Sequence, residues 1–376
     1  MFPFRVFVPE GTGANTRNGN NGGVTLHDTS FRGFASDNYA GIHPEVLAAI
    51  SDANGGHQIA YGEDVYTARL GEVIRAEFGE RAEVFPVFNG TGANVVALTA
   101  LLPRWGSVVA TSTAHIHTDE GGAPEKVAGL KLFVVPTPDG KLTPELLATE
   151  AWGMDDEHRA EPAAVSITQT TELGTLYTPD EVRAIADAAH AAGLAVHMDG
   201  ARIWNAAAAL GVPFREFTTD AGVDVLSFGG TKIGALGVEA IVVLNPERVA
   251  DIVRLRKTSM QLASKMRFFS AQLLALFDGV GLRAAEHANA MAARLRAALE
   301  AGLADGSITD LAFSQATQAN AVFAVLANDA ADRIRARFRF YDWDRAAGQV
   351  RWMTAFDTTE ADVDAFVAAI REELAR

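Results

Sequence analysis

The stretch DVLSFGGTKIGALGVEAIVVL, residues 224–244, places a lysine between two strongly apolar segments. Both segments have the length and composition of buried strands, and glycines at 229, 230 and 234 surround Lys232 between them. Lysine is rarely buried unless its charge is paired or neutralised, because removing an ammonium group from water is costly. The stretch therefore has two interpretations: Lys232 extends from a tight turn into solvent, or its amine takes part in chemistry.

Similar β-rich segments recur along the chain from residue 83 onward. They alternate with amphipathic helical patterns, and the predicted strands are residues 83–88, 107–113, 130–135, 163–168, 194–199, 223–228 and 238–244. This alternation is typical of an α/β fold with a mostly parallel sheet and helices on both faces. The helix after residue 178 is the clearest, because Thr178 and Glu181 form a capping box at its start and Gly193 stands at its end.

The character of the sequence changes after about residue 246. Helical patterns dominate at 248–257, 262–278 and 282–302, and shorter strand and helix patterns follow them. We therefore expect a large α/β domain at residues 31–280 and a small α+β domain at residues 281–376. Residues 1–30 include a Gly/Asn-rich run that cannot bury surface, and they are predicted to form a disordered tail.

Composition narrows the class of protein. The chain has 376 residues, 48% hydrophobic and 21% charged, which is typical of a globular protein with a sizeable core. Its net charge of -15 opposes binding to nucleic acids or to anionic membranes. No uninterrupted run of apolar residues approaches the roughly 18 residues of a membrane span. The absence of cysteine excludes disulfides and cysteine nucleophiles, and it is consistent with a cytoplasmic location.

Several groups of polar residues follow predicted strands, at the sheet edge where open α/β folds bind ligands. The loop NGTGAN, residues 89–94, opens a helix, so the amides of Gly90, Thr91 and Gly92 are placed to hold a phosphate, although such turns are often purely structural. The segment AHIHTDEGGAPE, residues 114–125, contains His115 and His117. Their spacing of two does not match the spacing of three or four expected of metal ligands on a helix, so no metal site is predicted.

The segment HMDGAR, residues 197–202, places Asp199 at a strand end and Arg202 three residues later, and Lys232 follows one strand further on. By itself the segment fits a surface ion pair. Together, the aspartate, the lysine, the glycine loop and His115 describe a pyridoxal phosphate site. The lysine binds the aldehyde of the cofactor as a Schiff base, the aspartate keeps the pyridine nitrogen protonated, and the loop binds the phosphate.

Seven motifs, in this order, resemble those of the low-specificity L-threonine aldolases, which have the aspartate-aminotransferase-like (type I) pyridoxal phosphate fold. They are SDNYAGIHPEV, YGEDVYTARLGE, FNGTGANVVAL, AHIHTDEGGAPE, TQTTELGTLYTPDE, VHMDGARIWNA and SFGGTKIGALG, and the resemblance covers most of residues 31–376. It implies Lys232 as the Schiff-base lysine, Asp199 as the partner of the ring nitrogen and His115 as the group stacked on the ring. It further implies cofactor contacts from Gly90, Thr91, Thr170, Arg202 and Arg267, and binding of the substrate carboxylate by Ser36, Arg202 and Arg351.

Two segments depart from the family pattern. Many members have an NTHN-like segment where this chain reads TQTTELG, so a histidine that can act on the substrate hydroxyl is missing. Thr170 occupies about that place, and His117 or Glu120 is the alternative group for this role. The glycine-rich GGGMRQ segment of the family appears as LASKMRFFSAQ, in which Arg267 matches the arginine that in the family reaches a phosphate across a subunit interface.

The resemblance implies a carbon–carbon lyase that cleaves L-threonine, L-allo-threonine and related L-3-hydroxy amino acids to glycine and an aldehyde, and that works as a homodimer, paired into a tetramer. A β-eliminating lyase or an aminotransferase would share Lys232 and Asp199, and remains an alternative. A nicotinamide-dependent oxidoreductase is disfavoured, because the GTGAN loop falls short of the dinucleotide-binding pattern. A non-catalytic scaffold is disfavoured because it would not need Lys232, Asp199 and His115 together.

Overall fold

The computed structural model describes residues 26–375, which fall into two units, one ending at Arg32 and one from Gly33 onward. In the first unit, the Asp28 carboxylate accepts hydrogen bonds from the N–H and the hydroxyl of Ser30. Most of the predicted tail, residues 1–25, lies outside the described residues. Everything that follows concerns the second unit.

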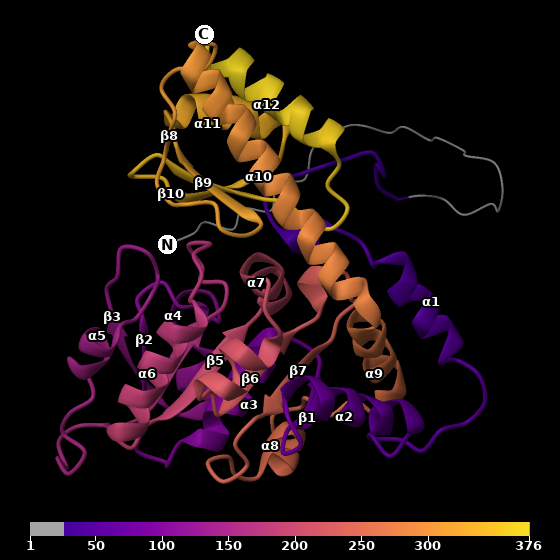
Figure 1. The fold of residues 1–376 in the computed structure, drawn as a ribbon, viewed down its shortest axis with the longest axis vertical. Coiled ribbons are helices and arrows are strands. Elements are labelled where there is room, and N and C mark those ends of the chain that lie inside the picture. The colour runs from indigo at the N-terminus through magenta and orange to yellow at the C-terminus, as the bar shows by residue number, and fades with distance from the viewer. Residues whose placement is uncertain (1–25, 376) are drawn as a thin grey trace. The chain divides into compact units, whose positions relative to one another are not determined.

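The larger of the two sheets in this unit has seven strands (Figure 1), in the order β1-β7-β6-β5-β4-β2-β3. The strands are β1 (Glu83–Val87), β2 (Gly106–Thr111), β3 (Lys131–Val135), β4 (Glu161–Thr168), β5 (Ala195–Gly200), β6 (Val225–Gly229) and β7 (Glu239–Val243). β7 runs antiparallel to both β1 and β6, and the pairs from β6 across to β3 are parallel. The predicted mostly parallel α/β sheet is therefore confirmed, and each predicted strand overlaps one of these seven.

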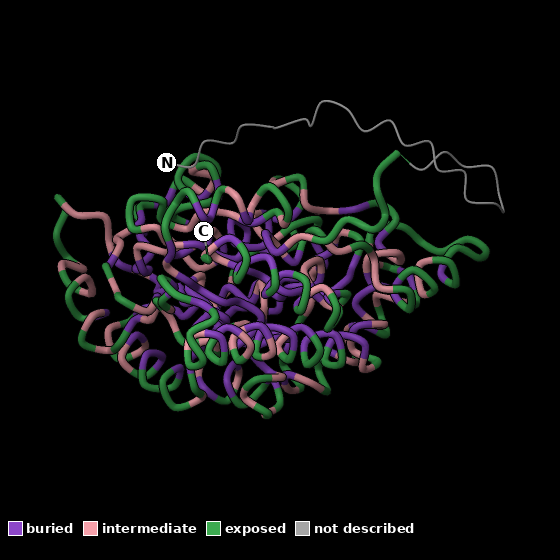
Figure 2. The backbone as a smooth tube through the Cα atoms, turned by 90° about the horizontal axis from the view of Figure 1, so that it is seen from above, coloured by how far each residue is buried: buried purple, intermediate pink, exposed green. Residues whose placement is uncertain are grey.

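Helices cover both faces of this sheet because alternate side chains of each strand point to opposite sides. Val242 packs in a core with helices α2 (Val65–Phe78), α6 (Pro179–Ala191), α7 (Ile203–Leu210) and α9 (Met266–Ala275). Its neighbour Ile241 packs in a second core with α3 (Gly90–Leu101) and α8 (Ile252–Thr258). Figure 2 colours each residue by burial and shows the buried residues gathered in the interior, with exposed residues around them. Three further α-helices precede α6 in the sequence: α1 (Pro44–Asp52), α4 (His115–Thr118) and α5 (Pro144–Ala148).

The predicted capping box of α6 is present. The Thr178 hydroxyl accepts from the Glu181 N–H, and the Glu181 carboxylate accepts from the Thr178 N–H. The chain then enters β5, which ends beside Asp199 as predicted.

A long helical run joins the two sheets. α9 is followed by a one-turn π-helix (Leu276–Val280) with non-helical dihedral angles at Asp278 and Gly279, and then by α10 (Gly281–Asp305). Gly281 is required because a Cβ there would lie 2.7 Å from the ring of Trp204 on α7. By length and composition the run Met266–Asp305 would suit a membrane span, but half of its apolar window is buried inside the protein, as in a core helix.

The C-terminal part contains a four-stranded antiparallel sheet in the order β10-β11-β9-β8. Its elements are β8 (Ala312–Phe313), β9 (Ala321–Val325), α11 (Asn328–Arg337), β10 (Tyr341–Asp344), β11 (Gln349–Met353) and α12 (Glu360–Leu374). Phe34, near the start of the unit, stacks on Phe366 of α12 with ring centroids 4.2 Å apart. The Phe34 carbonyl accepts a hydrogen bond from the Met353 N–H at 2.8 Å. The segment that contains Ser36 and Asp37 therefore starts in contact with β11 of the four-stranded sheet.

Candidate active site

Lys232 lies in a short 3-10 turn (Thr231–Ile233) between β6 and β7. The preceding glycines are needed for packing, because a Cβ on Gly229 would lie 2.6 Å from the Ala201 carbonyl oxygen and a Cβ on Gly230 2.6 Å from that of Val238. The Gly230 N–H donates to the buried carboxylate of Glu239 at 2.6 Å. These contacts fix the backbone from which the lysine side chain extends.

The surroundings of Lys232 favour its neutral form. Burial lowers the pKa of the amine, and the nearby positive charge of Arg202 acts in the same direction. The carboxylates of Asp37, Asp199 and Glu239 oppose this shift without cancelling it. A neutral amine is a nucleophile, so the environment fits an amine that reacts with a carbonyl group.

Asp199 stands at the end of β5, where its neighbours across the sheet are Thr168 of β4 and Ser227 of β6. Its side chain is held at both oxygens: Oδ1 accepts from the Ala201 N–H at 3.0 Å, and Oδ2 accepts from Nδ2 of Asn94 at 2.9 Å. Only 5% of the residue is exposed. A buried carboxylate held in this way fits a partner for a positively charged ring nitrogen.

His115 begins the single turn of α4 after β2 and is held by two carboxylates. Its Nδ1 lies 2.9 Å from Oε1 of Glu120, and its backbone N–H donates to Oε1 of Glu172 at 2.8 Å. Burial alone would lower the pKa of His115, but the bond to Glu120 and the charge of Asp199 outweigh burial, and the pKa is raised. The same burial, together with the charge of Asp199, raises the pKa of Glu172 to about 7.

Two arginines lie near these groups, Arg202 between β5 and α7 and Arg351 on β11. Arg202, just before α7, forms a bidentate pair with Asp37, with Nε–Oδ2 at 2.7 Å and Nη2–Oδ1 at 3.0 Å. Arg351 on β11 has a buried Nε without a hydrogen-bond partner, and burial together with the charge of Arg202 lowers its pKa to about 10. Two neighbouring guanidinium groups with unused donors fit a carboxylate ligand. Ser36 lies beside Asp37, and its hydroxyl accepts from the Asn38 N–H.

The glycine loop forms the start of α3 as predicted. Asn89 accepts the Gly92 N–H with its side chain and the Ala93 N–H with its carbonyl. The Gly92 amide, expected on the phosphate, is therefore bonded within the chain, whereas the amides of Gly90 and Thr91 at the start of the helix need no partner inside it. No atom lies within 4 Å of the Cβ position of Gly90, so there is room above it for a ligand. Thr170 is buried two residues beyond the end of β4.

Two residues singled out from the sequence lie apart from this cluster within the single chain. Arg267 on α9 is exposed and donates to the carbonyls of Gly55 and Gly56. His117 is exposed, whereas Glu120 is buried and already bonded to His115 and Asn94. Among residues 26–375, no group of three or more His, Cys, Asp or Glu side chains is arranged to hold a metal ion.

Four residues of the cluster were not identified from the sequence: Asp37, Asn94, Glu172 and, as a partner of His115, Glu120. Asp37 directly follows Ser36, and Asn94 is the last residue of the glycine loop, so both stand inside the motifs already quoted. Their partners are distant in sequence, since Asp37 meets Arg202 and Asn94 meets Asp199. Only the fold brings these pairs together.

Comparison with known proteins places this arrangement in a family. The model of the beta-eliminating lyases matches residues 33–329. Over 341 residues the chain is 44% identical to the low specificity L-threonine aldolase of Pseudomonas sp. (strain NCIMB 10558), covering 90% of this chain and 96% of that protein. It is 46% identical over 328 residues to the protein of the same name from Pseudomonas aeruginosa, covering 86% and 93%.

The chain belongs to the low-specificity L-threonine aldolases, within the beta-eliminating lyase family. The solved structure of Leishmania major threonine aldolase superimposes with a TM-score of 0.83 at 28% identity, covering 91% of this chain and 99% of that one. The predicted resemblance and the predicted fold class are therefore both confirmed. As a member of the threonine aldolases, the protein is an enzyme of the carbon–carbon lyase class.

Proposed function

We propose that this enzyme uses pyridoxal phosphate to cleave L-threonine, L-allo-threonine and related L-3-hydroxy amino acids to glycine and an aldehyde. The observation that carries the proposal is the meeting of Lys232, Asp199 and His115 with two arginines that are suited to a carboxylate. The names of the Pseudomonas relatives support the choice of substrate. We expect the enzyme to act in the cytoplasm, which the cysteine-free sequence supports.

The residues present fit the cofactor. The amine of Lys232, with its lowered pKa, suits the aldehyde carbon, and Asp199 suits the ring nitrogen. The free amides of Gly90 and Thr91 suit the phosphate, His115 the ring face, and Thr170 the ring edge. When bound, pyridoxal phosphate supplies an electron-withdrawing ring that stabilises negative charge at Cα of an amino acid.

The chain's own residues then determine which bond breaks. Arg202, Arg351 and Ser36 hold the substrate carboxylate and so fix the rotation about the bond to Cα, which orients the Cα–Cβ bond for cleavage. Asp37 holds one edge of the Arg202 guanidinium, so that the other edge is presented to the substrate.

Cleavage also requires removal of the proton from the β-hydroxyl group. Because Glu120 accepts the proton on Nδ1 of His115, the lone pair of the neutral ring lies on Nε2. We assign Nε2 as the atom that takes up the hydroxyl proton. His117 is exposed and Glu120 is occupied by two hydrogen bonds, which makes either a poorer choice for this role.

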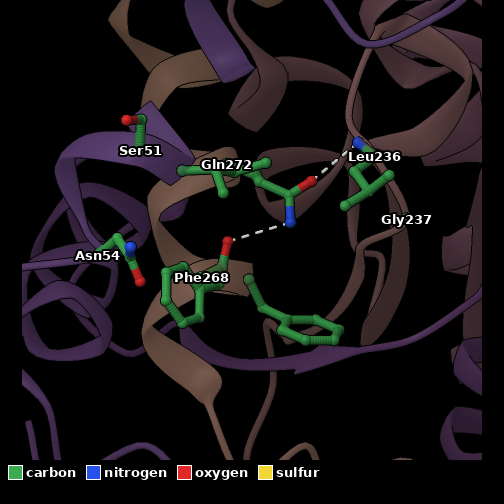
Figure 3. Close-up of a pocket in the computed structure, with 8 residues that line it drawn as sticks. Ser51, Asn54, Leu236, Gly237, Phe268 and Gln272 are labelled. Carbon is green, nitrogen blue, oxygen red and sulfur yellow. Dashed lines mark hydrogen bonds between the residues drawn. The ribbon is translucent and has the colours of Figure 1, made fainter. Parts of the chain in front are cut away.

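We further propose that two subunits share the site, as a dimer that pairs into a tetramer. An open hollow of about 450 Å³ lies beside α9 (Figure 3), and none of the predicted site residues lines it. Its lining residues are Ile50, Ser51, Asn54, Leu236, Gly237, Phe268, Phe269 and Gln272. Leu236 is 61% exposed, and the Arg267 guanidinium lies over the ring of Phe268, one of the lining residues, 4.8 Å from its centroid. An exposed apolar surface with an arginine at its edge supports contact with a second copy.

Product analysis tests the activity. With L-threonine, L-allo-threonine or L-3-phenylserine, we expect glycine and the matching aldehyde in equal amounts, dependent on added pyridoxal phosphate. A β-eliminating lyase would instead release ammonia and a 2-oxo acid from threonine, and an aminotransferase would need an amino-group acceptor. Light scattering on the eluting protein tests the assembly, because a fully active monomer contradicts the shared site.

A further inference from the structure

The side chain of Asn94 lies between two buried carboxylates that come from different parts of the fold. Its Nδ2 atom is 2.8 Å from Oε1 of Glu120 and 2.9 Å from Oδ2 of Asp199. Asn94 itself is 1% exposed, and the two acids are 8% and 5% exposed. An amide nitrogen has two hydrogens, so each carboxylate receives one of them.

The orientation of this amide follows from the charges around it. If the amide were reversed, its oxygen would face two carboxylate oxygens with no proton between them, which is repulsive. The chosen orientation leaves Oδ1 of Asn94 and Oε2 of Glu120 buried without a partner among the described residues. The two N–H donors therefore carry the interaction.

The hydrogen-bonded chain continues beyond Glu120. The oxygen that accepts from Asn94, Oε1 of Glu120, also lies 2.9 Å from Nδ1 of His115. Asp199, Asn94, Glu120 and His115 thus form one continuous connection, from the group suited to the ring nitrogen to the group suited to the ring face. No other described side chain bonds to both of these acids.

We infer that Asn94 is a positioning residue that holds Asp199 and Glu120 side by side as carboxylates and, through Glu120, fixes the orientation of His115. The inference rests on the proposed function, because it assigns Asp199 and His115 to the cofactor. Without the two N–H donors, two like charges would share a buried space without neutralisation. Asn94 therefore determines how tightly the cofactor is held.

Substitution by aspartate gives a test that depends on pH. Asn94→Asp keeps the shape of the side chain but adds a third carboxyl beside Asp199 and Glu120. The other titratable groups that act on this cluster are the amine of Lys232, the guanidinium of Arg202 and the carboxyl of Glu172. The neighbouring acids raise the pKa of the new carboxyl group. In mild acid the group is therefore protonated and donates one hydrogen bond. In mild alkali it is charged and repels both Asp199 and Glu120. Asn94→Leu has no donor at any pH.

The readout is the dissociation constant of pyridoxal phosphate, measured by absorbance titration of the purified apoprotein and compared with wild type at each pH. We expect Asn94→Leu to weaken binding on the order of ten- to a hundredfold at every pH, because it removes bonds to charged groups. We expect Asn94→Asp to bind nearly as well as wild type in mild acid and progressively worse as the pH rises. Thr99→Val, on the same helix, is the matched control and should bind as wild type does, because the Thr99 hydroxyl bonds only to the Val95 carbonyl.

Thermal melting of each apoprotein separates a binding defect from a folding defect. If Asn94→Leu does not fold, the pH dependence of Asn94→Asp still decides the question. Wild-type affinity of Asn94→Asp at all pH values, or a defect that does not change with pH, would overturn the inference. Failure of the wild-type protein to bind pyridoxal phosphate would instead contradict the proposed function.

Discussion

Replacement of Asp37 by asparagine tests the link between the fold and substrate binding. Asp37 is 3% exposed and makes two short bonds to Arg202, and its Oδ2 also accepts from Asn320 at 3.2 Å. Asparagine keeps the shape but loses the charge and one acceptor, so the Arg202 guanidinium loses its counter-ion. Removing one partner of a buried pair costs about 3–5 kcal/mol, and we expect a loss of this size in the free energy of unfolding.

The same change should affect catalysis through Arg202. Misplacement of a group that orients the substrate by about 1 Å costs on the order of a hundredfold in rate, so kcat/KM should fall by about that factor, mostly through KM. Urea unfolding and steady-state kinetics with L-threonine measure the two effects. The matched control is Asp220→Asn, which breaks a bidentate pair of the same geometry with Arg215, both bonds being 2.9 Å, on the surface. Exposed pairs contribute little, so this control should differ little from wild type.

The stability loss of Asp37→Asn should also depend on pH. Burial would raise the pKa of Asp37, but the charge of Arg202 outweighs it, and the pKa in the folded state is lowered. The pair therefore stabilises the fold above the pKa of an unfolded aspartate, and this contribution disappears as the pH falls through the lower folded value. The difference between wild type and Asp37→Asn should shrink in acid. Equal effects of Asp37→Asn and Asp220→Asn at neutral pH would refute the reasoning.

Three further predictions concern the proposed site. Asp199→Asn should retain part of its cofactor binding but lose most activity, because a neutral pyridine is a poor electron acceptor; near-wild-type turnover would show that Asp199 is not at the ring nitrogen. The pKa of His115 is raised, so kcat/KM should increase as the pH rises through a value above the pKa of free histidine. Glu120→Gln should shift this rise in the pH profile to lower pH, and an unshifted rise would argue against His115 as the base. Mixed Lys232→Ala and Arg267→Ala subunits should recover activity that neither variant shows alone, and no recovery after confirmed subunit exchange contradicts the shared site.

Much of the fold could be predicted because its signals are local. The strands of the large sheet are continuous apolar segments, as buried parallel strands require, and the capping box of α6 is contained within four residues. Lys232 and Asp199 were found in the same way, since each closes or follows an apolar strand. The relative placement of two strand ends then follows from the parallel order of the sheet.

The remaining features depend on contacts between distant segments. The predicted helix from residue 262 begins only at Met266, after a non-helical segment in which Met260 has a positive φ. Arg256 of α8 is buried although it is charged, and its Nη1 donates to the Pro86 carbonyl. Gly92 is needed because a Cβ there would lie 2.2 Å from the side chain of Gln261. Neither contact produces a recognisable pattern in the local sequence, because each joins residues that are far apart along the chain.

The most direct test of the central claim asks which amine holds the cofactor. The protein is loaded with pyridoxal phosphate and reduced with borohydride, which converts a Schiff base into a stable secondary amine, and its peptides are then mapped by mass spectrometry. The buried, glycine-bounded turn between β6 and β7 predicts one modified residue, Lys232, at close to one cofactor per chain. Modification of a different lysine, or no modification of an otherwise active enzyme, would contradict the assignment of Lys232.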